Sequence, residues 1–391
     1  MKILLIYPYP LYDRSQEEDI RPVPIGVYYV GALLRENGYD VEILNWYDIH
    51  KTPEKIAEVL HEKNPDVIGF SILNANRRGG IEIAEIAKQM KHFLRHFPQV
   101  DYVVIGEGEY TFLKLVRLIE NGQYKGLGGI KGIAFRKNGK VTKTKGVEVI
   151  KDPDELPVPA KYFEYQHISY SRGCPWKCAF CGSPAFWGRK IRFHSPEYFV
   201  SQLEMLYKKG ITFFYVSDDN FTVKKDRVID ICQRILEKNM KITWVAISRV
   251  SYVDEEMLYW MRKAGCTQIS YGVESGSEQI RALLQKDIKT DEIKNAFALT
   301  HKYGIIARAY FIYGSPEETR ETIQETVDLI HEIKPLICVF YILEVYPGTK
   351  LYLDYQKRFN MTDDVWLEGI EGICYFETDP SLSQESVLAF G

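Results

Sequence analysis

The sequence predicts an α/β protein with an N-terminal domain built on a mainly parallel sheet and a C-terminal partial barrel of six βα units. Short apolar runs alternate with amphipathic helical patterns along most of the 391 residues. Parallel strands need a crossover connection, usually a helix, so this alternation is typical of such folds. A proline-rich acidic segment at 152–159 separates two series of repeats. We therefore expect a first domain at 1–150, a linker at 151–163, a barrel at 164–350 and an extension at 351–391 without an assigned role.

The first series of elements alternates strand and helix patterns and ends in a hairpin. Strand patterns lie at 3–7, 40–44, 67–71 and 102–106, and helical patterns at 25–37, 53–63, 81–97 and 111–121. Ligands of open α/β sheets bind at the carboxyl ends of the strands, so the loops after these strands are candidate binding loops. Segments 132–136 and 141–145 flank Asn138-Gly139, a dipeptide that favours the type I′ turn of a β-hairpin.

The second series repeats six times. Its strand patterns lie at 167–171, 213–217, 242–247, 268–273, 307–312 and 338–343, with helical patterns such as 196–209 and 317–333 between them. Eight units close an ordinary βα barrel, so six predict an open barrel whose active site lies at the carboxyl ends of the strands. Four tyrosines near these ends are candidates for lining a substrate pocket: Tyr170, Tyr215, Tyr271 and Tyr310.

Composition excludes several classes of protein. The net charge is −3, with 26% charged and 46% hydrophobic residues, which is an ordinary globular balance without a strong attraction for nucleic acid or anionic membranes. The longest uncharged stretch, 22–34, is shorter than the ~20 apolar residues of a membrane span. The start of the sequence, at 1–8, has the pattern of a buried strand and lacks a secretory cleavage site. We expect a soluble, cytoplasmic protein.

Three cysteines form the chemically most informative motif. Cys174, Cys178 and Cys181 fall within eight residues, directly after the first barrel strand, while the other four cysteines are scattered. Clustered thiols in a reducing compartment indicate a metal site. Structural zinc sites usually have four ligands in paired knuckles, and no second knuckle exists here. Three cysteines suit an iron–sulfur cluster that leaves one iron open to another ligand. Zinc or unligated thiols is the alternative.

This Cys-x3-Cys-x2-Cys motif, with Phe180 before the third cysteine, resembles that of the radical S-adenosylmethionine (radical SAM) superfamily. The resemblance implies that the three cysteines hold a 4Fe–4S cluster and that the open iron binds the amino and carboxylate groups of S-adenosylmethionine. The reduced cluster would then cleave this cofactor to a 5′-deoxyadenosyl radical. The cofactors would carry the difficult chemistry, as is usual for radical reactions.

Further strand ends resemble the sites where this superfamily binds S-adenosylmethionine. Ser217, Asp218, Asp219 and Asn220 match its polar motif for the methionine amino group, and Arg249 suits the carboxylate. Glu274 and Ser275 match the motif that contacts the ribose, and Gly314 allows a close backbone approach to the adenosine. The resemblance also implies that Phe180 contacts S-adenosylmethionine. The alternatives are that the two acids begin a helix, that Arg249 forms a structural ion pair and that 272–277 is a capping loop.

The first domain resembles the Rossmann-like domain of the cobalamin-binding branch of the superfamily. The residues expected to face the corrinoid are Ser71, Asn74, Gly106, Glu107, Gly108 and Glu109. No Asp-x-His-x-x-Gly sequence supplies a lower axial histidine. Only four residues, 98–101, separate the predicted helix 81–97 from the strand at 102–106. The family usually has a further strand and a Gly-Gly loop there, so the domain is expected to lack one strand.

The expected function is reductive cleavage of S-adenosylmethionine by a radical SAM enzyme, leading to cobalamin-dependent methylation of an unactivated carbon. Cobalamin-independent oxidation, cyclisation or rearrangement is the alternative among enzymes. A non-catalytic iron–sulfur binding or sensor protein is the alternative of another class. The expected partners are an organic substrate and an electron donor such as a flavodoxin or ferredoxin, with no nucleic acid.

Overall fold

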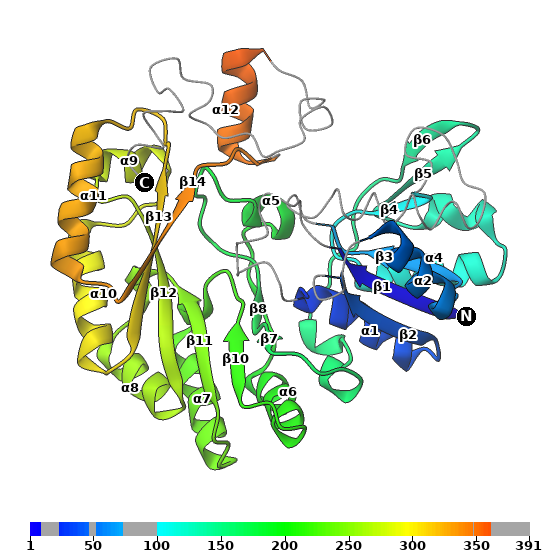
Figure 1. Cartoon of the computed structure of the whole chain (residues 1–391), viewed down its shortest axis with the longest axis horizontal. Helices are drawn as coiled ribbons and strands as arrows, with labels where there is room; N and C mark the ends of the chain where they lie inside the picture. The colour runs from blue at the N-terminus through cyan, green and yellow to red at the C-terminus, as the bar shows by residue number, and fades with distance from the viewer. Residues whose placement is uncertain (9–22, 47–51, 73–99, 347, 361–391) are drawn as a thin grey trace. The chain divides into compact units, whose positions relative to one another are not determined.

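A computed structural model describes residues 1–8, 23–46, 52–72, 100–346 and 348–360. The chain divides into two compact units, Met1–His167 and Ile168–Gly391. Figure 1 shows the elements of both units, and each unit is described by itself. The predicted helix at 81–97 and the candidate Asn74 lie outside the described residues.

The first unit contains a three-stranded parallel sheet with strand order β2-β1-β3. Side chains on a strand alternate between its two faces. Ile3, Leu5 and Tyr7 of β1 therefore belong to one buried cluster with residues of α1 and α4, while Leu4 and Ile6 belong to another with Ile56 and Leu60 of α2. The elements are β1 (Lys2–Tyr7), α1 (Ile25–Glu36), β2 (Asp40–Asn45), α2 (Pro53–Lys63), β3 (Val67–Phe70) and α4 (Glu109–Glu120).

The strand after the predicted helix 81–97 does not join this parallel sheet. β4 (Tyr102–Val104) pairs antiparallel with β5 (Ile133–Lys137), which pairs with β6 (Lys140–Lys143). Among the described strands, β3 therefore has β1 as its one neighbour, and the unit carries two small sheets. The predicted hairpin is confirmed, because Asn138 and Gly139 have φ values of 53° and 75°, as a type I′ turn requires.

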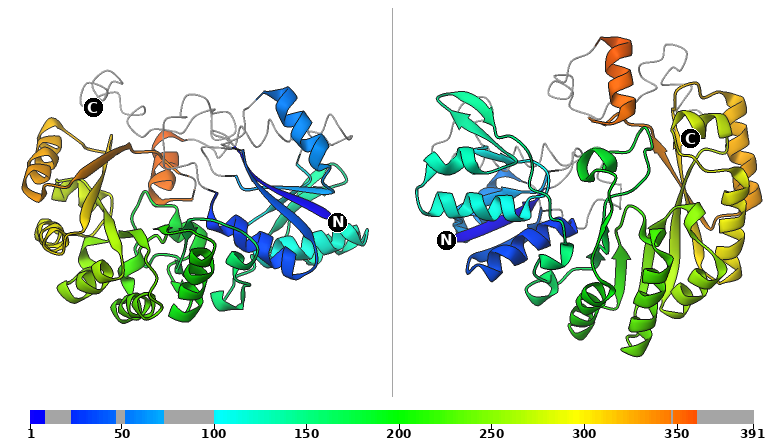
Figure 2. Two further views of the ribbon diagram at one scale, coloured as in Figure 1. Left: turned by 60° about the horizontal axis from the view of Figure 1, so that its bottom comes forward. Right: turned by 180° about the vertical axis from the view of Figure 1, so that it is seen from behind.

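The second unit contains a six-stranded parallel sheet with strand order β14-β13-β12-β11-β10-β7. The longer helices that connect these strands lie on one side of them (Figures 1 and 2). This confirms a partial barrel of six βα units. The strands are β7 (His167–Ile168), β10 (Phe213–Val216), β11 (Thr243–Ser248), β12 (Cys266–Glu274), β13 (Ile306–Tyr313) and β14 (Ile337–Ile342).

The first barrel strand is shorter than predicted. The backbone N–H groups of Tyr170 and Ser171 donate to the Asp218 carboxylate, so the chain leaves the parallel sheet after Ile168. It continues in a short antiparallel pair, β8 (Ser171–Arg172) with β9 (Arg192–Phe193).

Helix boundaries follow the capping residues. Ser195 accepts from the N–H of Tyr198 before Pro196, and Thr319 accepts from the N–H of Thr322, so the helix predicted from 317 begins at Arg320. The helices are α5 (Ser183–Trp187), α6 (Pro196–Lys208), α7 (Lys225–Glu237), α8 (Glu255–Lys263), α9 (Glu278–Leu283), α10 (Thr290–Lys302), α11 (Arg320–Ile333) and α12 (Lys350–Phe359). Short 3-10 turns occupy Tyr124–Gly129, Pro153–Glu155, Pro159–Lys161, Phe221–Val223 and Val250–Tyr252.

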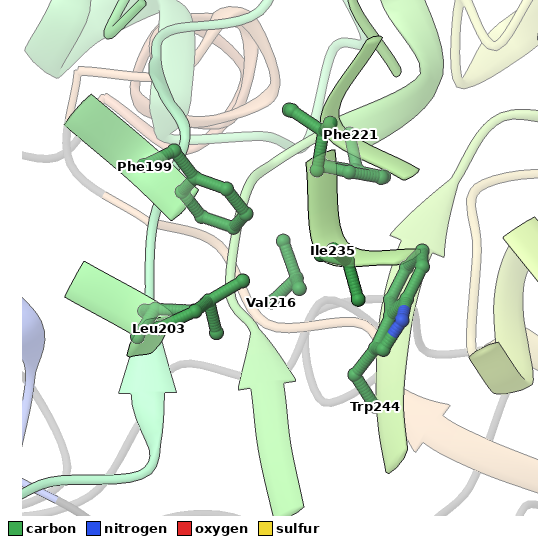
Figure 3. Close-up of a pocket in the computed structure, with 8 residues that line it drawn as sticks. Phe199, Leu203, Val216, Phe221, Ile235 and Trp244 are labelled. Atoms are coloured by element: carbon green, nitrogen blue, oxygen red, sulfur yellow. The ribbon is translucent and has the colours of Figure 1, made fainter. Parts of the chain in front are cut away.

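A small apolar cavity lies between the sheet and its helices. It is lined by Ile168, Phe199, Leu203, Val216, Phe221, Ile231, Ile235 and Trp244. Figure 3 shows six of these side chains directed toward a common centre. The lining offers no charged group and no nucleophile, so this is a gap in the packing and not a site for a charged cofactor. No helix within the described residues combines the length and hydrophobicity needed to cross a bilayer.

Candidate active site

The cysteine loop follows β8 and is held in place by contacts from three other parts of the second unit. The N–H of Ala179 donates to the carbonyl of Leu284 at 2.8 Å, and the carbonyl of Ala179 accepts from the N–H of Leu351 at 2.9 Å. The Trp176 ring lies under the Arg249 guanidinium, whose carbon is 3.6 Å from the ring centroid. The loop is thus fixed by backbone hydrogen bonds and stacking, independently of its thiols.

The three predicted ligands lie close enough to influence one another electrostatically. Burial raises the pKa of the Cys174 and Cys178 thiols, and it raises the pKa of Cys181 to about 11. The charges of Lys286 and Arg249 oppose this rise in the pKa of Cys178, and the charge of Glu274 adds to it. Binding of iron requires thiolates, so two neighbouring cations favour the form of Cys178 that ligates a metal.

This donor set fits a 4Fe–4S cluster better than a single ion. Among the described residues, no three His, Cys, Asp or Glu side chains converge as the ligands of one metal ion do. In a four-iron cluster each cysteine binds a different iron, so the thiolates need not converge on one point. Three half-buried thiols on one loop meet that requirement.

The loop after β10 carries four predicted cofactor residues, 217–220, and they do not all have the same role. Asp218 is buried and accepts from the N–H of Tyr170 at 2.9 Å and of Ser171 at 2.5 Å, so it fixes the strand that leads to the cysteines. Burial raises the pKa of Asp218 to about 7, against the effect of these donors. Asp219 accepts from the Ser183 hydroxyl at 2.5 Å.

Asn220 carries an unused donor at the centre of the site. Its Oδ1 accepts weakly from Thr222 and from the N–H of Arg249, both at 3.4 Å. Its Nδ2 is buried without a hydrogen-bond partner among the described residues. A buried amide donor left unpaired is costly, so this atom is suited to a ligand that accepts a hydrogen bond. Ser217 is exposed, and its backbone N–H donates to Ile168.

Arg249 is a structural residue with one donor to spare. Its Nη2 donates to the carbonyls of Lys286 and Asp287, and its Nε donates to Ser251 at 3.1 Å. Within the described part of the chain, Nη1 has no partner, so it is free to meet an anionic group. The arginine therefore joins the cysteine loop, through Trp176, to the turn at 286–287.

Glu274 ends β12 in a buried ion pair. Its Oε1 accepts from Lys286 Nζ at 2.6 Å, with the two side chains only 8% and 11% exposed. Glu274 has a φ of +68°, and the register of β12 against β13 shifts between Gly272 and Glu274. A Cβ on Gly272 would lie 2.4 Å from Oε1 and 2.6 Å from Nζ, so glycine is needed for this pair to lie against the strand. Within the described residues, the second carboxylate oxygen makes no hydrogen bond and stays available.

Two predicted residues are used mainly within the protein. The Ser275 hydroxyl accepts from the N–H of Ser277 at 3.1 Å, and the Ser275 backbone carbonyl accepts from Arg281. The N–H of Gly314, whose φ is +80°, donates to Glu318 at 2.5 Å. Neighbouring Ser315 has a buried hydroxyl without a partner among the described residues. Sequence reasoning did not select Ser315.

Phe180 was predicted to contact S-adenosylmethionine, whereas the residues that support it and Lys286 were missed from the sequence. Phe180 packs on a cluster of α9, the end of β14 and α12, which includes Ile280, Leu343 and Tyr352. Residues 351–359 of the unassigned extension therefore support the cysteine loop. No local sequence pattern indicated Lys286, because its partner Glu274 is twelve residues away, across a turn. Of the four candidate tyrosines, Tyr215 is 40% exposed and Tyr310 half-buried, while Tyr170 and Tyr271 are buried in the core.

The candidate cobalamin residues of the first unit follow β3 and β4. Ser71 lies directly after β3, next to Ile72, which is 47% exposed. Gly106 has a φ of +84°, Gly108 caps α4, and the Glu107 carboxylate accepts from the N–H of Ile150 at 3.3 Å. Glu109 is buried in the first turn of α4. These loops follow strand carboxyl ends, the usual ligand position in α/β domains, so they fit a bound corrinoid.

An open six-stranded βα barrel that carries three thiols and unpaired polar atoms at its strand ends defines a cofactor-dependent enzyme of the radical type. A model of the radical SAM superfamily matches residues 168–330, and a model of the B12 binding domain matches residues 21–116. The chain belongs to the radical SAM superfamily, in the group with an N-terminal B12 binding domain. Its cofactors are a 4Fe–4S cluster, S-adenosylmethionine and cobalamin.

Individual relatives agree with this assignment. An uncharacterized methyltransferase of Pyrococcus horikoshii is 32% identical over 90% of this chain and 82% of its own length. An anaerobic magnesium-protoporphyrin IX monomethyl ester cyclase of Rubrivivax gelatinosus is 25% identical over 93% of this chain and 71% of its own. The solved radical S-adenosylmethionine methyltransferase TsrM of Kitasatospora setae is 15% identical over 91% of this chain and 75% of its own, with a TM-score of 0.77, so it shares the fold.

Proposed function

We propose that this radical SAM enzyme methylates an unactivated carbon in a cobalamin-dependent reaction. The observation that carries the proposal is the presence in one chain of a B12 binding domain and a barrel with an open-iron cysteine motif. A corrinoid can carry a methyl group, and a radical can activate a carbon that has no acidic proton. The 32% identical relative, named as a methyltransferase, supports this outcome.

The cofactors supply the chemistry, which is one-electron cleavage of S-adenosylmethionine and delivery of a methyl group. In this proposal Cys174, Cys178 and Cys181 hold the cluster. The unpaired donors, Asn220 Nδ2 and Arg249 Nη1, suit the methionine carboxylate, because both are hydrogen-bond donors. The free oxygen of Glu274 accepts from the ribose hydroxyls.

The two acids after β10 take different roles in this arrangement. Asp218 positions the first strand and does not contact the cofactor, because both of its oxygens already accept hydrogen bonds from 170–171. Asp219, which faces Ser183 beside the cysteine loop, is the acceptor suited to the methionine ammonium. The amino group would thus be held by Asp219, and the carboxylate by Asn220 of the same loop together with Arg249, which follows β11.

The proposal is tested with S-adenosylmethionine carrying a deuterated methyl group. The protein, loaded anaerobically with iron, sulfide and cobalamin, is incubated with a reductant and a small-molecule extract of the source cells. Methylation predicts S-adenosylhomocysteine and 5′-deoxyadenosine in similar amounts, because one molecule of S-adenosylmethionine gives its methyl group and another is cleaved reductively. It also predicts an extract compound that carries the label.

Ring closure is the second candidate, because the Rubrivivax relative is named as a cyclase. This reaction predicts 5′-deoxyadenosine without S-adenosylhomocysteine and without label in any product. That pattern would refute methylation and retain the radical step. Absence of both nucleosides, in protein with a full complement of iron, would refute the proposed use of S-adenosylmethionine.

A further inference from the structure

The segment that carries the cysteines is strongly basic. Residues 172–192 contain five Lys or Arg side chains and no Asp or Glu, although the whole chain has a net charge of −3. Two of the five are internal, since Arg172 and Arg192 are 6% and 9% exposed and lie over the Trp187 ring. The other three, Lys177, Arg189 and Lys190, are exposed.

These three exposed cations have no acidic partner within the described residues. The nearby acid, Asp219, accepts from Ser183 instead. No acid in the part of the chain that the structure describes neutralises their charge, which is presented to solvent. An exposed cluster of one sign raises the local concentration of oppositely charged molecules and speeds their encounter with the protein.

An aromatic side chain lies within the same segment. Phe186 of α5 is 55% exposed. Its ring packs edge to face against the Trp187 ring, with the two ring centroids 4.6 Å apart. Aromatic residues are enriched at protein interfaces, where charged groups form the rim. Electron-transfer complexes are among the smallest protein–protein interfaces, so few residues are needed to form one. We call Lys177, Phe186, Arg189 and Lys190 the basic patch.

The position of the patch indicates what kind of partner it serves. Lys177 lies between two cluster ligands, Cys174 and Cys178, in the sequence, and Phe186 follows Cys181 by five residues. A partner on this patch would lie beside the cluster loop, where an incoming electron has the shortest path. We propose that the basic patch is the docking surface for an acidic one-electron carrier protein of the flavodoxin type. This inference rests on the proposed redox use of the three cysteines.

The electron balance of the docked complex is simple. The flavodoxin hydroquinone, an anion at neutral pH, gives up one electron and becomes the neutral semiquinone, so no proton is transferred. The cluster accepts that electron and changes from the oxidised 2+ state to the reduced 1+ state. No bond of the protein is formed or broken, so the patch contributes binding and orientation alone.

The test compares two variants with the same change in charge. R189E/K190E reverses two charges of the patch, and K140E/K143E reverses two exposed charges on β6 of the first unit. Flavodoxin hydroquinone is mixed with the cluster-loaded proteins, and bleaching of the cluster is followed by stopped flow. We expect R189E/K190E to slow reduction about tenfold at low salt, with a smaller difference at high salt, and K140E/K143E to have little effect.

Two further measurements separate docking from damage to the site. Reduced methyl viologen, a small cation, should reduce R189E/K190E no more slowly than the unaltered protein. Binding of oxidised flavodoxin, measured by calorimetry without any turnover, should weaken in parallel with the rate. F186A, which keeps every charge, should weaken this binding several-fold and retain its salt dependence.

Each result bears on the inference. Equal slowing in both charge variants, or in neither, would overturn the assignment of the patch. Loss of reduction by viologen in R189E/K190E would indicate a damaged cluster, and the F186A result would then decide. If viologen reduces the protein but no 5′-deoxyadenosine forms from S-adenosylmethionine, the proposed function fails while the docking result stands.

Discussion

Replacing Lys286 by methionine removes one partner of the buried ion pair with Glu274. The two atoms are 2.6 Å apart, and the side chains are only 11% and 8% exposed. Methionine keeps most of the length of the lysine chain and its packing against Gly272, so the main change is the loss of the ammonium. The Glu274 carboxylate is then left without its cation in a largely desolvated position.

The expected loss in the free energy of unfolding follows from this burial. Breaking a buried pair by removing one partner costs about 3–5 kcal/mol, because an uncompensated charge stays inside the protein. Because Lys286 and Glu274 keep some exposure to solvent, we expect the loss in the free energy of unfolding to lie near the lower end of this range. The matched control is Lys302→Met, which breaks the pair between Lys302 and Glu255 at 2.8 Å, with side chains 57% and 56% exposed. An exposed pair contributes about 0.2–1 kcal/mol.

Urea unfolding of the metal-free proteins at pH 7, followed by tryptophan fluorescence, measures both effects. Trp176, Trp187, Trp244 and Trp260 lie in the second unit and report on its transition. The double variant K286M/E274M replaces the pair by two apolar side chains and should recover much of the lost stability. The reasoning is refuted if K286M costs no more than K302M, or if the double variant is less stable than K286M.

Three further predictions follow from single contacts of the site. Cys178→Ala should abolish both cluster loading and reductive cleavage of S-adenosylmethionine, whereas Cys338→Ala should not; unchanged iron in C178A would contradict the cluster assignment. Gly276→Ala should lower thermal stability strongly, because its Cβ would lie 2.3 Å from the Glu325 carbonyl oxygen, and an unchanged melting temperature would contradict this packing. The pKa of Asp218 is raised to about 7 from an ordinary 3.8, so between these values the folded protein holds a proton that the unfolded chain releases. The free energy of unfolding should therefore fall as pH rises from about 4 to about 7. Asp218→Asn should remove this part of the pH dependence, and an identical pH dependence in both proteins would contradict the prediction.

Local pattern was enough to predict most of the barrel. Each of its six strands is an apolar run followed by an amphipathic helix, and such periodicity depends on neighbouring residues alone. The cysteine loop was equally visible, because its spacing is local. By contrast, the exit of the chain from the sheet after Ile168 depends on Asp218, some fifty residues later, and no local pattern carries that information.

The first unit shows the same limit. The run at 102–106 has the composition of a parallel strand, yet β4 pairs with the hairpin strand β5. Parallel pairing needs a neighbouring parallel strand with a free edge, and pairing partners are set by tertiary context. The hairpin itself was predictable, because a two-residue Asn-Gly turn fixes its register locally.

The contacts of the site separate residues that shape it from atoms left for a ligand. Asp218, Ser275 and Gly314 match the motifs for S-adenosylmethionine, but their polar groups already bond to other parts of the chain. They act by positioning, and their substitution would be felt first as a loss of structure. Asn220 and Arg249 each make structural contacts and also keep a donor unused. Since the unpaired amide donor of Asn220 is buried and costs free energy that only an acceptor can recover, Asn220 is the residue at which binding of the cofactor should also stabilise the fold.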